Sequence, residues 1–387
     1  MNRKVFFYVQ HLLGIGHLQR AANIAKAISK KNIDISLISG GLKVPQINLD
    51  NVRTFHLPEI RSLDDSFKIL VDVNNKPINE YIKNKRKKLL LEKFTSLNPG
   101  ILIIEMFPFG RRQMSFELIP LLELARNQKS KIHIVCSVRD VLVKKKQTSR
   151  HEEMLDIANK YFDYILVHSD KNIITFDKTF PLTKELKSKL IYTGYVYNNS
   201  NDSKKKSQKE YPDIIVSAGG GAVGTKLLQT AIKARNISPL KHFKWMILVG
   251  INETKENIEK LKSLANNYFN GLTIEPARDD FFHLLKNSKI SISQGGYNTL
   301  TDILATNTAS IVIPYNGKYG SDQILRSKVF SKKNLIYVLD EKLLSPENLS
   351  IHIEKALLNK NKIKTSVDLR GAENTAKIIH QLITYNE

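Results

Sequence analysis

The stretch KVFFYVQHLLGIGHLQRAANIAKAI, residues 4–28, sets the expected fold of the first half of the chain. An apolar strand over residues 4–9 runs into a turn punctuated by Gly14 and Gly16, and a segment with apolar residues at helical spacing follows. Dinucleotide-binding proteins begin in the same way, but Gln19 stands where their third glycine should be. The stretch therefore predicts a parallel α/β domain whose first loop serves another ligand.

Two series of short apolar runs alternate with longer helical segments along the chain. The first series covers residues 4–9, 34–39, 53–57, 101–105, 131–136, 163–168 and 190–196. The second series covers residues 213–217, 245–249, 272–275, 289–293, 310–314 and 335–339. Such alternation is typical of βαβ units, so it predicts two Rossmann-like α/β/α domains with mostly parallel sheets.

The polar, charged stretch over residues 198–210 separates the two series and is expected to be a linker. We expect an N-terminal domain over residues 1–197 and a C-terminal domain over 211–387, with a last helix that ends the second domain or returns to the first. Ligands of open parallel sheets bind outside the carboxyl ends of the strands. The expected site is therefore the cleft between the two domains.

Composition limits the class of protein. The chain has 387 residues, of which 42% are hydrophobic, enough to bury two cores. No apolar run approaches the eighteen or so residues of a membrane-spanning helix and no cleavage signal follows the N-terminus, so a cytoplasmic protein is expected. The single cysteine, Cys136, lies in the apolar run KIHIVC and is expected to be a packed strand residue.

The charge is strongly positive, with 60 Lys and Arg residues against 37 Asp and Glu residues and a formal net charge of +23. This balance favours an anionic partner, whether nucleic acid, anionic lipid or phosphorylated substrate. A coding bias toward Lys, Asn and Ile would produce the same balance, with lysines that only solvate the surface. Composition alone does not choose among these alternatives.

Two glycine turns follow strands of the second series. The first contains Gly219, Gly220 and Gly221, and the second contains Gln294, Gly295 and Gly296 before a helix expected to open near Asn298 or Thr299. Glycines allow close backbone approach, and the free N–H groups of a helix start favour phosphate. Asp302, about one turn into that helix, could accept hydrogen bonds from a ribose diol or could only complement the helix dipole.

Six motifs occur in order along nearly the whole chain: GIGHLQRA, EMFPFGRR, SVRD, YTGYV, SAGGGAVG and SQGGYNT. Together they resemble the GT-B glycosyltransferases of family 28. The resemblance implies metal-independent, inverting transfer of a hexose or N-acetylhexosamine from a UDP-type sugar to a hydroxyl acceptor, which can be lipid-linked. It implies no cofactor and no metal, in keeping with the absence of a D-x-D signature from the sequence.

The resemblance also assigns residues to the donor. The glycine loop at 219–221 is expected beside the donor, and the segment from Gln294 to Asp302 is expected to hold its diphosphate and ribose. Asp302 stands where the family has Glu. Gln323, which follows Asp322 at a helix start, falls where family members contact the donor sugar. Phe282, with Phe281 before it, lies near the segment that contacts uracil.

On the acceptor side, the resemblance matches Gly14, Gly16 and His17 to a glycine-rich loop. His17 at a helix start is expected to stay neutral and act as a base, with a turn-filling role as the alternative. Glu105, at the end of a strand, is a second candidate base or else a structural partner of an arginine. Arg111, Arg112 and Arg139 are expected on the acceptor side, with packing as the alternative for Arg139.

Two other functions remain open at this point. A nucleotide-sugar epimerase shares the expected architecture. A nucleic-acid-binding protein would explain the charge, but the sequence shows no zinc spacing and no aromatic-basic sheet signature, so no nucleic acid is expected as a partner. Basic clusters at residues 81–94 and 144–146 lie next to apolar residues and predict docking to an anionic membrane surface.

Overall fold

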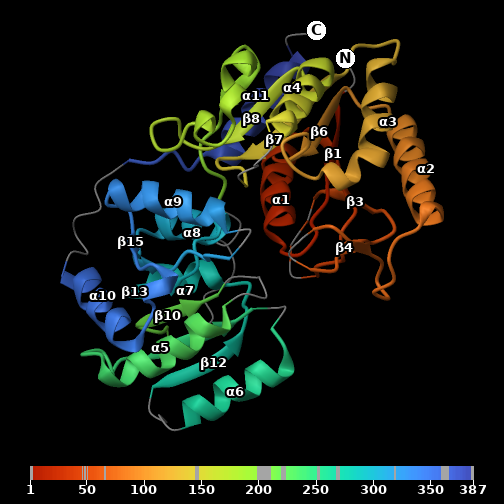
Figure 1. Ribbon diagram of the computed structural model, residues 1–387. Helices are drawn as coiled ribbons and strands as arrows, with labels where there is room; N and C mark the ends of the chain where they lie inside the picture. Colours follow the sequence, from red (N-terminus) through yellow and green to blue (C-terminus); the bar gives the residue numbers. More distant parts are fainter. Residues whose placement is uncertain are drawn as a thin grey trace. The chain divides into compact units, whose positions relative to one another are not determined.

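The computed structural model describes residues 3–384, apart from 46, 48, 50, 65–66, 144–147, 198–210, 219–223, 251–252, 267–270, 318–319 and 359–365. The chain forms two compact units, shown in Figure 1. Unit 1 comprises Met1–Tyr197 together with Asp368–Glu387, and unit 2 comprises Asn198–Val367. The expected linker at 198–210 lies outside the described residues.

A seven-stranded sheet forms the centre of unit 1, and its neighbouring strands all pair in parallel. In sheet order the strands are β3 (Arg53–His56), β2 (Asp34–Ser39), β1 (Lys4–Val9), β6 (Ile101–Glu105), β7 (His133–Arg139), β8 (Tyr164–His168) and β9 (Leu190–Tyr192). All seven strands of the first predicted series are present. Because the strands are parallel, their carboxyl ends meet at one edge.

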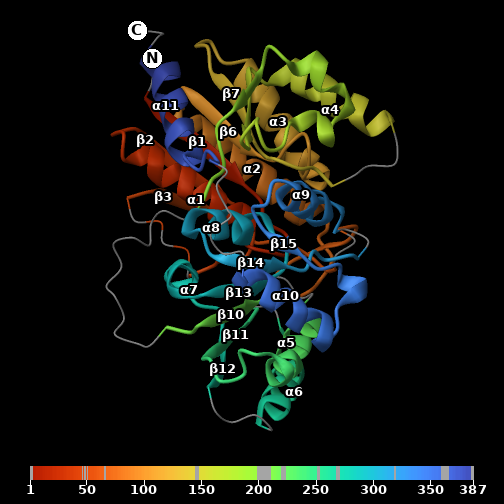
Figure 2. The same cartoon turned by 90° about the vertical axis from the view of Figure 1, so that its left-hand side faces the viewer.

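Helices cover both faces of this sheet. They are α1 (Gly16–Ser29), α2 (Glu80–Leu97), α3 (Ser115–Arg126), α4 (Ser149–Tyr161) and α11 (Gly371–Thr384), with short 3₁₀ turns at Arg112–Met114, Phe176–Lys178 and Pro181–Leu186. Helices α1 and α11 pack in one apolar core, and α2, α3 and α4 pack in a second core across the sheet. Figure 2 shows α1 and α11 on one side of the sheet and α3 and α4 on the other.

The last helix belongs to unit 1, so the second unit ends at Val367 and does not reach the C-terminus. The returning chain is fixed beside β9, where the Tyr195 N–H donates to the Asp368 carbonyl at 2.7 Å and the Gly371 N–H donates to the Tyr195 carbonyl at 3.0 Å. A Cβ at Gly371 would lie 2.4 Å from the carbonyl oxygen of Gly194, so a side chain does not fit there. The return of α11 thus depends on glycine at its first residue.

Unit 2 contains a six-stranded sheet that is also parallel throughout. In sheet order the strands are β12 (Leu272–Pro276), β11 (Trp245–Val249), β10 (Ile214–Ser217), β13 (Ile290–Ser293), β14 (Ala309–Val312) and β15 (Tyr337–Val338). The helices are α5 (Thr225–Ile237), α6 (Lys255–Asn266), α7 (Phe281–Asn287), α8 (Tyr297–Thr306), α9 (Ser321–Lys332) and α10 (Pro346–Leu358), and a 3₁₀ turn spans Glu341–Leu343. Both predicted α/β domains are therefore confirmed.

One element was not predicted from the sequence. A short antiparallel hairpin, β4 (Arg61–Ser62) and β5 (Leu70–Val71), lies between β3 and α2. Leu63 and Ile69 next to its strands are 46% and 45% exposed, so the hairpin presents apolar side chains to solvent. Cys136 is fully buried in β7, as expected.

Candidate active site

The carboxyl edge of the unit 1 sheet brings together residues that are far apart in sequence. Glu105, Arg139 and His168 are the last residues of the neighbouring strands β6, β7 and β8. The turn after β1 leads into α1 at the same edge, and the register sets Glu105 beside Ser137. Open parallel sheets bind ligands at this edge, so it is the candidate site of unit 1.

His17 and Glu105 are in direct contact. His17 is the second residue of α1, which begins at Gly16 without a side-chain cap, and its Nδ1 lies 3.1 Å from Glu105 Oε1. The Glu105 side chain is fully buried, whereas that of His17 is 14% exposed. This geometry leaves Nε2 as the ring nitrogen that faces away from the carboxylate.

Glu105 has partners for both of its oxygens. Arg20 Nη2 donates to Oε1, which also accepts from His17, and Ser137 Oγ donates to Oε2 at 2.5 Å. Arg20 Nη2 also lies 3.1 Å from His17 Nδ1. We assign a proton to Nδ1 because a carboxylate oxygen only accepts, so the bond between His17 and Glu105 needs Nδ1 as its donor. A buried carboxylate with these partners is placed to orient His17. It has no access to a substrate hydroxyl.

The environment of His17 disfavours its protonated form. Burial is the largest cause that lowers its pKa well below 6.5, followed by the positive charges of Arg111, Arg20, Arg139 and His11. The sequence predicted a neutral ring because of the helix dipole, whereas the structure assigns the lowering to burial and arginines. A neutral imidazole can accept a proton at neutral pH.

Arginines make this edge strongly cationic. Arg111 follows β6 with a φ of 62°, and its Nε donates to the Gln10 carbonyl at 2.7 Å. Burial, and next the charge of Arg139, lower the pKa of Arg111 to about 10. Cations held close together favour an anionic ligand. Arg112 was also expected on the acceptor side. Its side chain is instead exposed and donates to Glu153 of α4 at 3.0 Å, away from these cations.

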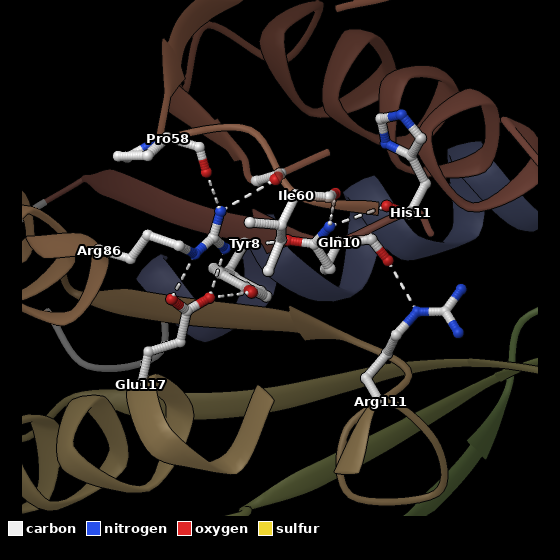
Figure 3. A network of polar contacts seen from close by, with 9 residues as sticks. Tyr8, Gln10, His11, Pro58, Ile60, Arg86, Arg111 and Glu117 are labelled. Atoms are coloured by element: carbon white, nitrogen blue, oxygen red, sulfur yellow. Dashed lines mark hydrogen bonds and ion pairs between the residues drawn. The ribbon is translucent and has the colours of Figure 1, made fainter. Parts of the chain in front are cut away.

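A second buried network supports the turn after β1 (Figure 3). Arg86 of α2 and Glu117 of α3 form a fully buried ion pair at 2.7 Å, and the Tyr8 hydroxyl donates to the same Glu117 oxygen. Arg86 Nη2 also donates to Gln10 Oε1 at 2.9 Å. The Gln10 carbonyl accepts from Arg111, so the network also fixes the Gln10 backbone that holds the Arg111 side chain.

The two glycines of the opening turn differ in their surroundings. A Cβ at Gly14 would meet nothing within 4 Å, so the loop surface over Gly14 is open. Gly16 is the first residue of α1, and the N-cap residue Ile15 makes no side-chain cap bond. The open surface at Gly14 therefore lies close in sequence to His17 at the start of α1.

In unit 2, the turn Gln294-Gly295-Gly296 follows β13 and leads into α8 at Tyr297, one residue before the predicted start. Gly296 is the N-cap and its helix start has no side-chain cap, which suits an anionic group. Gly295 has a packing role, because a Cβ there would lie 2.6 Å from Ser327 Oγ of α9. Asn298 and Thr299 lie in the first turn of α8.

The predicted polar residues of the donor segment lie on α8 and α9. Asp302 of α8 is buried at 9% exposure, and Asp322 of α9 accepts from Arg326 Nη1 at 3.4 Å. Gln323 Oε1 accepts from the Tyr315 N–H at 3.2 Å, and its amide NH₂ group is not used in that bond. Arg326 was not predicted, although its spacing of four from Asp322 fits an ion pair on one helix face.

Other predicted donor residues are placed less directly. Phe282 is buried at 6% exposure inside α7, whereas Phe281 at the helix start is partly exposed, so Phe281 is the more accessible ring. Gly219, Gly220 and Gly221 lie outside the described residues.

Within the described part of the chain, no group of three His, Cys, Asp or Glu side chains could hold a metal ion, and no helix is long and apolar enough to cross a membrane.

Comparison with known families adds to this geometry. The profile of the glycosyltransferase family 28 C-terminal domain matches residues 214–382. Over this region the chain is similar to the family 28 glycosyltransferases. Over 228 residues it is 28% identical to the UDP-N-acetylglucosamine–N-acetylmuramyl-(pentapeptide) pyrophosphoryl-undecaprenol N-acetylglucosamine transferase of Clostridium tetani, and the match covers 56% of this chain and 61% of that protein. The chain thus spans about three fifths of the length of this curated relative.

Solved structures establish the GT-B fold over the whole chain. Acinetobacter baumannii MurG aligns with a TM-score of 0.58 and 14% identity, covering 98% of this chain and 99% of that one. Neisseria meningitidis UDP-GlcNAc 2-epimerase aligns with a TM-score of 0.63 and 13% identity, covering 99% of this chain and 100% of that one. At these identities the likeness shows the fold alone, and the fold is shared by transferases and epimerases.

Proposed function

We propose that the protein is a glycosyltransferase that moves an N-acetylhexosamine or hexose from a UDP-type sugar to a hydroxyl of a lipid-linked, anionic acceptor. The observation that carries the proposal is the contact of His17 with buried Glu105 at the carboxyl edge of unit 1. The family 28 profile over residues 214–382 supports a nucleotide-sugar site in unit 2. The name of the Clostridium tetani relative supports the donor and acceptor classes.

In the proposed step, His17 Nε2 removes the proton of the acceptor hydroxyl while that oxygen attacks the anomeric carbon. The new bond joins the acceptor oxygen to the anomeric carbon, and the bond to the diphosphate oxygen breaks with its electron pair leaving on UDP. Attack from the face opposite the diphosphate inverts the anomeric configuration. Glu105 keeps the His17 Nδ1 protonated and stabilises the imidazolium that forms.

For the donor, we propose that the start of α8, where the N-cap residue is Gly296, receives the diphosphate and that Asp302 accepts from the ribose. Asn298 and Thr299 would add polar groups in the same turn, and the Gln323 amide NH₂ would reach the sugar. Asp322 would act through Arg326, which also lies 3.4 Å from the Gly295 carbonyl. The proposed chemistry uses no metal and no cofactor, so transfer is expected to persist in EDTA.

For the acceptor, we propose that Arg111 and Arg139 receive its anionic group beside His17. Their positive charges act on His17 and on each other, since both lower the pKa of His17 and the charge of Arg139 lowers that of Arg111. Gly14 lies open at the same turn and would allow close approach of the acceptor. A phosphorylated acceptor would relieve the mutual repulsion of the cations.

We further propose that unit 1 docks to an anionic membrane through the β4–β5 hairpin and the start of α2. Val73 and Tyr81 there are 57% and 71% exposed, and Lys85 and Lys88 on α2 are exposed as well. Arg86, in the basic cluster expected to face lipid, is instead fully buried and takes no part in docking. The cluster at residues 144–146 lies outside the described residues.

Vesicle co-sedimentation tests the docking surface. Vesicles with anionic lipid should bind the protein at low salt and release it at high salt, with each basic residue near the surface worth about 1 kcal/mol. Replacing Val73 and Tyr81 by Ser should weaken binding. Leu358→Ser in unit 2, where the native side chain is 84% exposed, is the matched control and should bind as before. Binding that is absent at low salt contradicts the docking proposal.

Two experiments test the transferase activity. The first is thermal unfolding in the presence of UDP-GlcNAc, UDP-GalNAc and UDP-glucose, because a true donor stabilises the native state by mass action. The second is transfer from the stabilising donor to a polyprenyl-diphosphate-linked sugar, with the product's anomeric configuration determined by NMR. Stabilisation by no nucleotide sugar, or a product with retained configuration, would contradict the proposal.

A nucleotide-sugar epimerase is the second candidate, because the Neisseria meningitidis epimerase shares the fold with a TM-score of 0.63. An epimerase would incorporate solvent deuterium into the sugar with no acceptor present. A transferase would leave the donor sugar unlabelled under the same conditions. Deuterium uptake into the sugar in the absence of acceptor would therefore favour the epimerase over the transferase.

A further inference from the structure

Behind the contact of His17 with Glu105, a chain of buried polar side chains continues into unit 1. Ser137 Oγ donates to Glu105 Oε2 at 2.5 Å and also lies 2.8 Å from His168 Nε2. His168 Nδ1 lies 2.8 Å from Thr193 Oγ1. Ser137, His168 and Thr193 are each at most 1% exposed, so none of them is placed to touch a substrate.

The donors in this chain can be assigned one by one. The Ser137 hydroxyl uses its single proton toward Glu105, so its oxygen accepts from the N–H at His168 Nε2. Burial, followed by the charge of Arg20, lowers the pKa of His168 well below 6.5, so the ring is neutral and its Nδ1 accepts from the Thr193 hydroxyl. The protons of Ser137 and His168 therefore point toward Glu105, whereas the Thr193 hydroxyl lies 2.8 Å from His168 Nδ1 and also 3.1 Å from the Gly194 carbonyl oxygen.

The far end of the chain is anchored to the backbone. The Thr193 N–H donates to the Val167 carbonyl at 3.0 Å, and the Thr193 carbonyl accepts from Asn374 Nδ2 of α11 at 2.8 Å. Thr193 is thus held between β8 and the returning C-terminal helix. A fixed Thr193 gives His168 one ring orientation, which in turn fixes the oxygen of Ser137.

We propose that Ser137 and His168 are positioning residues for His17, which act by holding Glu105 as a carboxylate in one orientation. The terminal torsion of a Glu side chain is broad, so the bond from Ser137 is needed to stop its rotation. A fixed Glu105 keeps the proton of His17 on Nδ1 and leaves Nε2 as the acceptor. The inference rests on the proposed function only for its kinetic readout.

The direct test is the tautomer of His17 in the full-length protein, measured by long-range ¹H–¹⁵N correlation and assigned with His17→Gln. The parent protein should carry the proton on Nδ1, and Ser137→Ala should give a mixture with the Nε2-protonated form. Ser137→Thr keeps the hydroxyl and should restore the parent spectrum. Ser39→Ala is the matched control, because Ser39 ends β2 of the same sheet, is 1% exposed and has no bonded partner for its hydroxyl among the described residues.

A second pair of variants guards against misfolding of Ser137→Ala. His168→Gln keeps a donor near the Nε2 position and should retain the parent tautomer, whereas His168→Asn is too short and should give the mixture.

In transfer assays, Ser137→Ala should lower kcat by about tenfold or more without a change in donor KM, since a bond to a charged group is lost.

The outcomes separate the two claims. A His17 that keeps its proton on Nδ1 in both Ser137→Ala and His168→Asn overturns the positioning role, as does a parent protein protonated on Nε2. Tautomers that shift as expected support the positioning role even where no donor is transferred. In that case only the proposed function fails.

Discussion

Replacement of His17 by Ala tests whether this ring is the base of the proposed transfer. The side chain is 14% exposed and lies at the start of α1, so its removal should leave the fold intact. Donor binding should also stay intact, because the proposed donor residues belong to unit 2. We expect transfer to fall while donor affinity stays within about twofold of the parent value.

The size of the loss follows from the charges around the ring. At an effective dielectric constant of about 20, the attraction between Glu105 and an imidazolium 3.1 Å away is about 5 kcal/mol. Arg20 Nη2 lies at the same 3.1 Å distance and cancels about as much. Burial and the two remaining arginines then keep His17 a weak base, so we expect a loss of about 10²- to 10³-fold, the lower part of the range for general bases.

Glu105→Gln and the double variant complete the experiment. Without the carboxylate, the repulsion from Arg20 on the imidazolium is no longer offset, so Glu105→Gln should lose up to as much activity as His17→Ala. If Glu105 works only through His17, the double variant should lose no more than the worse single variant, since residues that act as a unit are not additive. Initial rates at saturating donor and acceptor give these comparisons.

Folding controls are needed because Glu105→Gln removes the carboxylate that pairs with buried Arg20. Such a change costs about 3–5 kcal/mol, so thermal unfolding should be compared for each variant. Arg20→Gln combined with Glu105→Gln removes both charges of the pair and is the matched control. A large loss in folded Glu105→Gln with a mild loss in His17→Ala would make Glu105 the base and refute the reasoning. Losses that add in the double variant would refute it as well.

Three further predictions concern the donor and the pH dependence. Asp302→Ala should weaken UDP-sugar binding by about ten- to a hundredfold in calorimetric titrations, since a bond to a charged group is lost. Unchanged affinity would mean that Asp302 only complements the helix dipole. His17 must be neutral to act and its pKa is lowered, so activity should persist as pH falls through 6.5 and disappear only below that pH. Arg139→Gln removes one of the cations that lower this pKa, so its activity should be lost at a higher pH than that of the parent. Folding stability should also fall with acidification, because the pKa values of His11, His17 and His168 are all lowered, that of His11 to about 4, so below pH 6.5 the unfolded chain binds more protons. In urea titrations, the free energy of unfolding should fall by up to about 4 kcal/mol per pH unit. A free energy of unfolding that stays constant between pH 6.5 and 5 would contradict this prediction.

The sequence by itself located the strands closely. Residues 4–9 are both the predicted run and β1, and residues 34–39 and 101–105 likewise match β2 and β6. These segments are short, apolar and bounded by turns, so local chemistry decides them. The β4–β5 hairpin was missed because its strands have two residues each, too few to show a period.

The sequence also marked His17 and Glu105 as candidates, because each stands where a strand meets its loop or helix. It could not place them in contact, since 88 residues separate them and the sheet order that sets β6 beside β1 is not a local property. The exclusion of Glu105 as the residue that touches substrate depends on its burial, which arises from that same packing.

What only the tertiary structure decided are the partners behind these residues. Arg111 and Arg112 are neighbours with the same chemistry, yet one lies among the cations of the candidate site and the other bonds Glu153 on the surface. Ser137 and His168 lie in apolar strands, where hydrophobic patterns alone predict packing. Periodicity reports the environment of a residue along its own element, whereas hydrogen-bond partners across β6, β7 and β8 are set by the parallel crossovers that align the carboxyl ends of those strands.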